Sequence, residues 1–188
     1  IGILRMLIFD GTFYHLWYLP ASVTGVLLLW VLGKKVNFKV LTSIGLILYG
    51  IGLFGDSYYG FTERFPPAKQ IYHALFHVFS YTRNGLFYVP VFVIIGAWFR
   101  HRSLNRKRMF YICGFFISFF CMTCEGMLLH TLEIQRHDSM YLSLLPCMYF
   151  LFAVILSIEK QPAPILRGIS TWIYLLHPLM IILVRGIA

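Results

Sequence analysis

Charged residues are scarce in this sequence of 188 residues: only 12% are aspartate, glutamate, lysine or arginine, and seven are acidic. In contrast, 59% of the residues are hydrophobic and 18% are aromatic, and the mean hydropathy is +0.75. One core of a soluble domain of this size cannot bury so much apolar surface. The composition therefore predicts an integral membrane protein of the all-α class, a polytopic bundle of transmembrane helices.

The local motifs of several enzyme classes are also missing. The sequence has no P-loop, no G-x-S-x-G and no paired-carboxylate glycosidase pattern. The four cysteines all fall in apolar runs, which argues against a secreted disulfide framework and favours packed thiols. Cys121 and Cys124 form a C-x-x-C, but within an apolar helix that lacks the exposed helix start of redox motifs.

A signal peptide is not evident at the start of the chain. The sequence opens at Ile1 without methionine, and residues 1–9 show neither a basic start nor a small-residue cleavage site. We therefore expect a fragment whose first helices are missing, with residues 1–188 forming part of one transmembrane domain.

Apolar runs of membrane-spanning length are abundant. About 20 residues are needed to cross the hydrocarbon layer. The third run below is short unless residues 71–82 belong to it as part of a broken helix. The six predicted spans are 16–33, 38–54, 85–99, 109–125, 140–158 and 169–187.

The sixteen basic residues give a check on this topology, because cytoplasmic loops are enriched in lysine and arginine. Ten of them fall in the alternate loops 34–39, 100–108 and 159–168, which we predict to be cytoplasmic. Six of the seven acidic residues fall on the opposite side. The net charge of +9 is thus explained by membrane topology and anionic lipid, without nucleic acid, and the pattern predicts a multi-pass membrane protein.

The second connection, residues 55–84, is long for a linker. Phe65-Pro66-Pro67 predicts a turn followed by an interfacial helix from Ala68, and its aromatic residues suit the headgroup zone. Arg83 and Asn84 then stand at the mouth of an apolar run. A lipid-facing guanidinium there would cost about 2.5–3.5 kcal/mol, so these side chains should face other helices or a wet cavity.

Several histidines and charged residues gather on the predicted outer side. Either some of them line a polar site, because ionisable groups near the membrane are costly to keep, or they are simply wet loop residues. His73 and His77 lie one helical turn apart, which permits metal binding, yet a third ligand is missing and a wet or interfacial face is the simpler reading. No metal site is predicted.

Two further motifs have a chemical and a structural interpretation. Gly55-Asp56-Ser57 echoes a hydrolase motif, but a glycine that ends a helix, followed by a polar turn, explains it better. His177-Pro178 lies inside the last span, where proline frees backbone carbonyls. The imidazole is then a proton carrier, a ligand contact, or a partner of a freed carbonyl.

Four sequence blocks together resemble a known family. They are YHLWYLPA (14–21), TRNGLF (82–87), HDSMYL (137–142) and WIYLLHP (172–178), with GDS (55–57) between them. In this order they resemble the acyltransferase-3 family of multi-helix membrane proteins. Within that family they look most like the membrane module of the membrane serine racemases of vancomycin resistance.

The resemblance implies a bundle of about ten helices that transfers an acyl group, commonly acetyl from acetyl-CoA, to an extracytoplasmic acceptor. The racemase resemblance implies instead a module that brings L-serine to a fused or associated racemase domain that carries pyridoxal phosphate. The catalytic histidine of the family would lie upstream of this chain, and the racemase domain is absent from it. No cofactor is therefore expected in the chain itself, and a membrane anchor is a third alternative.

We expect a shared polar pocket that opens outward. In an acyltransferase, Arg83 would stabilise negative charge and a histidine would move the proton. In a serine importer, Arg83 would hold the carboxylate and an aspartate would meet the ammonium group. The candidate substrate-binding residues are His15, Asp56, Arg83, Asn84, His137, Asp138 and His177.

Overall fold

The computed structural model describes residues 17–101, 104 and 106–158, and every regular element in that part is a helix. The all-α prediction is thus confirmed for these residues. The sixth predicted span, His15, His177 and the loop 159–168 lie outside them. The helices are α2 (Tyr18–Gly33), α3 (Phe38–Phe54), α4 (Tyr59–Glu63), α5 (Pro66–Val78), α6 (Val89–His101), α7 (Arg108–Thr131) and α8 (Leu144–Leu156).

Five of the predicted spans coincide with helices, although not always at the predicted ends. Helix α3 has the predicted bounds, and its first turn is capped by the Asn37 side chain, which accepts a hydrogen bond from Val40 N at 2.9 Å. Helices α6 and α8 begin four residues later than predicted, at Val89 and Leu144. A helix is also present where the interfacial helix was predicted from Ala68: α5 begins two residues earlier, at Pro66, with two prolines at positions where a missing N–H costs nothing.

Only α7, among the described helices, is both long and apolar enough to cross a membrane. It has 24 residues, and 11% of its most apolar stretch is buried. Large side chains such as Phe116 and Phe120 are exposed on it. Helices α2, α3, α6 and α8 are apolar but shorter. The expectation of packed thiols is wrong for three cysteines: Cys113, Cys121 and Cys124 are free and exposed on α7, and only Cys147 is buried.

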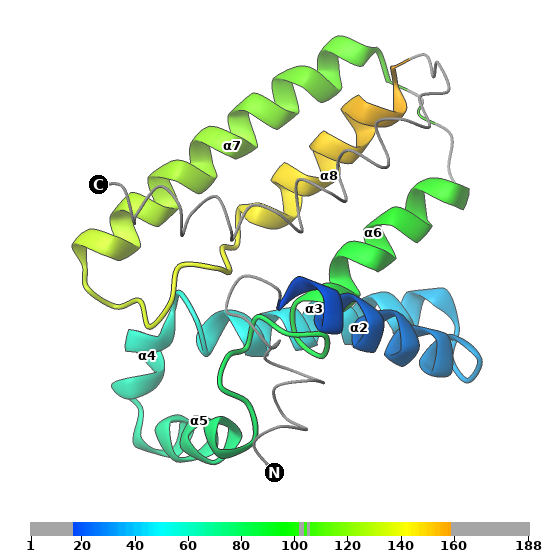
Figure 1. The fold of residues 1–188 in the computed structure, drawn as a ribbon. Helices are drawn as coiled ribbons and strands as arrows, with labels where there is room; N and C mark the ends of the chain where they lie inside the picture. The colour runs from blue at the N-terminus through cyan, green and yellow to red at the C-terminus, as the bar shows by residue number, and fades with distance from the viewer. Residues whose placement is uncertain (1–16, 102–103, 105, 159–188) are drawn as a thin grey trace, which may run out of the picture. The chain divides into compact units, whose positions relative to one another are not determined.

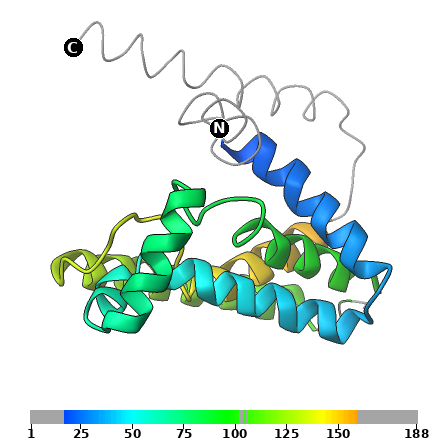
Figure 2. The ribbon, with the colours of Figure 1, turned by 90° about the horizontal axis from the view of Figure 1, so that it is seen from below.

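Small residues allow the helices to approach closely. A Cβ atom added at Gly45 would lie 2.5 Å from Ile94 Cδ1, and one at Gly25 would lie 2.7 Å from Val89 Cβ, so both glycines sit against α6. Helices α7 and α8 run side by side (Figure 1). Figure 2 shows the short turn that joins α2 to α3.

The helices alternate in direction, so their ends form two groups. Phe99 at the end of α6, Tyr111 at the start of α7 and Ala153 near the end of α8 form one buried cluster. At the other end, Asp56 after α3 bonds Ser139 N before α8. The first group adjoins the basic connection after α6, and the second holds acidic residues, as the charge pattern predicts.

The backbone carbonyl groups at the C-terminal end of α3 accept hydrogen bonds from side chains of three other segments. Tyr72 Oη donates to Ile51 O at 2.7 Å, Thr82 Oγ1 to Gly52 O at 2.9 Å, and Thr62 Oγ1 to Phe54 O at 2.8 Å. Carbonyls at a helix end need partners when they are buried. The long connection 55–84 is therefore built around this helix end, and it fixes the position of the residue that follows, Asp56.

Candidate functional site

Asp56 is fully buried directly after α3. Its Oδ1 atom accepts hydrogen bonds from Ser139 N at 2.8 Å, from Met140 N at 3.0 Å and from the Ser57 hydroxyl at 3.1 Å. Its Oδ2 atom is buried and has no hydrogen-bond partner within the described part of the chain. Within the described residues, Oδ1 thus accepts all of the carboxyl group's hydrogen bonds and Oδ2 accepts none.

Burial raises the pKa of Asp56, because a charged carboxylate is costly away from water. The Ser139 N–H, the Ser57 hydroxyl and the charge of nearby His137 act in the opposite direction but do not cancel this effect. The pKa of a buried acid of this kind is strongly affected by a cation placed next to it.

Arg83 is also buried, with 9% of its surface exposed. One terminal nitrogen, Nη1, donates to Ser139 Oγ at 3.1 Å. The guanidinium carbon lies 4.7 Å from the ring centroid of Tyr81 and 5.5 Å from that of Trp17, within the range of cation–π contacts. The guanidinium is therefore enclosed by protein groups.

Ser139 connects these two charged residues. Its backbone N–H binds Asp56 and its hydroxyl accepts from Arg83. A buried cation and a buried anion therefore bind to opposite parts of a single serine. The two charged side chains are thus linked through one residue, by its backbone N–H on one side and its hydroxyl on the other.

His137 lies beside this pair. Its ring centroid is 4.8 Å from that of Tyr81, and its backbone carbonyl accepts a hydrogen bond from Ser57 Oγ at 3.1 Å. Burial lowers the pKa of His137, the charge of Asp56 opposes that change, and the charges of Arg136 and Arg83 add to it. A neutral imidazole is favoured next to the guanidinium.

The remaining predicted residues do not join the cluster in the same way. Asn84 is buried beside Arg83, but its amide donates to Tyr81 O at 2.8 Å and accepts from Leu86 N and Phe87 N, which shapes its own turn. Asp138 is exposed. His15 and His177 are outside the described residues, so their part in the site stays a prediction.

Other residues of the site were missed from the sequence. Trp17 and Tyr81 contact Arg83, and Ser139 contacts both charged residues. Trp17 and Ser139 lie in the blocks of family resemblance, and Tyr81 directly precedes one of them. His73 and His77 are exposed on α5, and their ring centroids lie 4.8 Å apart. Across the described residues, no group of three or more histidine, cysteine or acidic side chains is arranged to hold a metal.

A second carboxylate holds the start of α8. Glu125 Oε1 accepts from Tyr58 Oη at 2.7 Å and from Leu142 N at 2.6 Å, and Oε2 accepts from Ser143 N at 2.8 Å. Carboxylates are favourable at the N-terminal end of a helix, where backbone N–H groups are unsatisfied. We call residues 139–143 the clasped segment, because Asp56, in the turn after α3, and Glu125, on α7, both bind its backbone.

The described residues form an all-helical module with a buried acid and a buried arginine, and one of its helices is long and apolar enough to cross a membrane. Residues 3–188 match the acyltransferase-3 family, described as an acyltransferase domain, and the chain belongs to this family.

Among curated relatives are two proteins of Enterococcus faecalis named amino-acid racemase. They are 37% identical over 99% of this chain and 41% identical over 90% of it, which correspond to 27% and 24% of those proteins. A serine/alanine racemase of Enterococcus gallinarum is 39% identical over 94% of this chain and 25% of its own length. The chain thus spans about a quarter of these relatives. No solved structure matches it significantly.

Proposed function

We propose that this chain is the membrane module of an amino-acid racemase-type protein and that it binds a small amino acid, of the serine or alanine kind, for passage across the bilayer. The observation that carries the proposal is the pair formed by Asp56 and Arg83 on either side of Ser139. The names of the relatives supply the class of substrate. Pyridoxal phosphate would belong to a racemase part outside this chain.

The two ends of an amino acid suit the two charged groups. A guanidinium has five N–H donors and binds carboxylates well. The unpartnered Oδ2 atom of Asp56 would accept from the ammonium group. Burial raises the pKa of Asp56, and the positive charge of an ammonium group placed beside Oδ2 would act in the opposite direction.

Binding of L-serine to the intact protein tests the assignment. Asp56→Asn keeps the Oδ1 hydrogen bonds and removes the charge, so it should weaken binding by about tenfold or more, the scale of one lost charge-assisted hydrogen bond. Arg83→Gln should do the same. Glu63→Gln, at an exposed acid on α4 outside the candidate set, is the matched control and should bind as the wild type does. Equal affinity of the Asp56→Asn and wild-type proteins would refute the proposed site.

Acyl transfer is the second candidate, and the family match to an acyltransferase domain favours it. Arg83 would then stabilise developing negative charge, and His137 would carry the proton. Acyl-CoA would be the donor. Labelled serine that accumulates in vesicles without an acyl donor supports uptake, whereas release of free CoA with an acylated acceptor supports transfer. A module that only anchors its partner would show neither activity, and Arg83 variants would give the same result as the wild type in both assays.

The proposed topology is a multi-pass bundle in a bacterial plasma membrane, with loops 34–39, 100–108 and 159–168 on the cytoplasmic side. The alternating direction of α3, α6, α7 and α8 supports it. A cysteine introduced at Glu63 should react with an impermeant maleimide in intact cells, and one at Lys35 should not. The reverse labelling pattern would contradict the orientation.

A further inference from the structure

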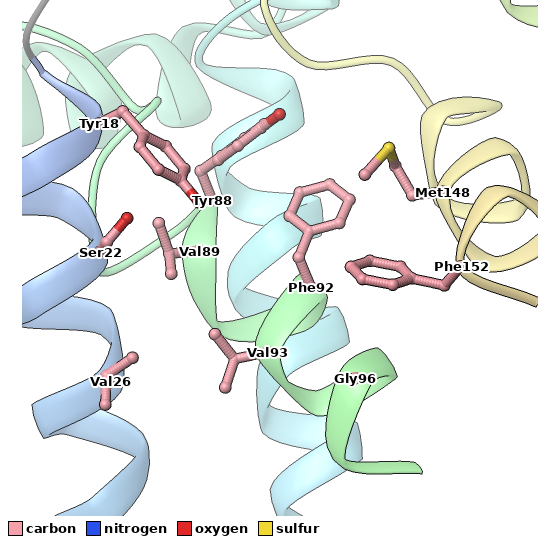
Figure 3. A pocket seen from close by; sticks show the side chains of 10 residues that line it. All are labelled: Tyr18, Ser22, Val26, Tyr88, Val89, Phe92, Val93, Gly96, Met148 and Phe152. Atoms are coloured by element: carbon pink, nitrogen blue, oxygen red, sulfur yellow. The ribbon is translucent and has the colours of Figure 1, made fainter. Parts of the chain in front are cut away.

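A pocket separate from the charged pair lies between α2, α6 and α8. Its volume is about 440 Å³, within the usual range for small-molecule sites. Figure 3 shows its wall: Ser22 and Val26 come from α2, Phe92 and Val93 from α6, and Phe152 from α8. None of the residues that line it is charged, so it does not suit a zwitterion.

Polar groups occur only at one end of this pocket. Tyr18, Ser22 and Tyr88 supply them, while Gly96 and Phe152 lie further along the helices in apolar surroundings. Tyrosines of membrane proteins are enriched at the level of the lipid headgroups. The polar end therefore corresponds to the interface, and the apolar end points toward the middle of the bilayer.

The Ser22 hydroxyl marks this polar end as a binding position. Its Oγ atom is buried and has no hydrogen-bond partner among the described residues. Thr24, two residues further along, donates to Pro20 O at 2.8 Å in the ordinary helical manner. A buried hydroxyl without a partner is costly, and a ligand acceptor at this position would satisfy it.

We propose that the pocket holds one acyl chain of a membrane phospholipid, with the ester carbonyl accepting a hydrogen bond from Ser22. Tyr18 and Val26 of α2 line the pocket and are about half exposed, so lipid chains are its neighbours in the bilayer. Apolar cavities of this kind do not retain water but do take up apolar molecules. The order of groups in such a lipid, ester first and hydrocarbon second, matches the polar and apolar ends of the pocket.

Gly96 allows the pocket to be filled without disturbing the protein. A Cβ atom built there meets no atom within 4 Å, so Gly96→Leu should occupy the cavity itself. Gly50 on α3 is equally open and does not line the pocket, which makes Gly50→Leu the matched control. Ser22→Ala removes only the hydroxyl, and Ser43→Ala on α3 is its control.

The experiment uses the intact protein in vesicles that contain a phosphatidylglycerol with a photoreactive diazirine on one acyl chain. In the wild type and in Gly50→Leu, mass spectrometry should find label on Phe92 or Phe152 as well as on Phe120, the exposed aromatic residue of α7. Gly96→Leu should lose the pocket label and keep the label on Phe120. Ser22→Ala should lower the pocket label relative to Phe120, whereas Ser43→Ala should not.

Three results would overturn the proposal: label on Phe120 with none in the wild-type pocket, pocket label that is unchanged in Gly96→Leu, or pocket label that is displaced by excess soluble acyl-CoA. The last outcome would assign the pocket to an acyl donor. Pocket label that is unchanged in Ser22→Ala would overturn the ester contact. Serine binding measured on the same samples keeps failure here distinct from failure of the proposed amino-acid site.

Discussion

Replacing Glu125 by glutamine would weaken the hold on the start of α8. The carboxylate accepts three hydrogen bonds, two from backbone N–H groups of Leu142 and Ser143 and one from the Tyr58 hydroxyl. Glutamine has one acceptor oxygen, and its NH₂ group would face a donor. The substitution therefore removes the negative charge and leaves at least one donor without an acceptor.

The size of the effect follows from these contacts. A helix cap contributes about 0.5–2 kcal/mol, and a hydrogen bond to a charged group about 1.5–3 kcal/mol. Glu125 is only partly buried, so water replaces some of the loss. We expect Glu125→Gln to lower the free energy of unfolding by about 2 kcal/mol.

Unfolding in mixed detergent micelles measures this change. Glu63→Gln, an exposed acid on α4, is the control and should alter stability by less than about 0.5 kcal/mol. A double-mutant cycle with Tyr58→Phe should give a coupling energy of about 1 kcal/mol, because the two side chains share a hydrogen bond. A loss in Glu125→Gln no larger than in the control, or a coupling energy of zero, would refute the clasp.

Four other substitutions test the packing and the buried acid. Gly52→Ala would place a Cβ 2.7 Å from the Met140 side chain and should destabilise the protein by about 1–3 kcal/mol, whereas Gly50→Ala on the same helix should stabilise it by up to about 1 kcal/mol in the same unfolding assay. The pKa of Asp56 in the folded state is above its ordinary value of 3.8. The free energy of unfolding of the wild type should therefore fall as the pH rises from 3.8 through the raised pKa. Asp56→Asn should lack this pH dependence when unfolding is measured at several pH values. Tyr49→Phe removes a 2.6 Å hydrogen bond to a backbone carbonyl and should cost about 1 kcal/mol in denaturant titration.

Helix positions were predictable because the apolar runs are long and are bounded by charged or turn residues. The ends of α6 and α8 were not. Asn84 accepts from two following N–H groups and so makes a separate turn before Val89. The backbone before Leu144 is held by Asp56, a residue more than 80 positions away. Hydropathy reports which residues avoid water, and it carries no information about such distant partners.

The charged residues of the site could be predicted from the sequence, whereas their uncharged neighbours could not. Burying a guanidinium or a carboxylate is costly, so Arg83 and Asp56 stand out in an apolar sequence. Ser139 and Tyr81 carry no charge and give no such signal. The predicted role of Asn84 in substrate binding is untested, and the hydrogen bonds of its amide go to the backbone of its own turn.

The clasped segment also limits how this protein can move. Carboxylates from the end of α3 and from α7 hold neighbouring peptide groups of residues 139–143. Sliding one helix past the other would strip backbone N–H groups of their acceptors, so α3, α7 and the start of α8 must travel as one rigid body. A transport cycle would then require its hinges at the edges of this block, because neither α2 nor α6 contributes to the clasp.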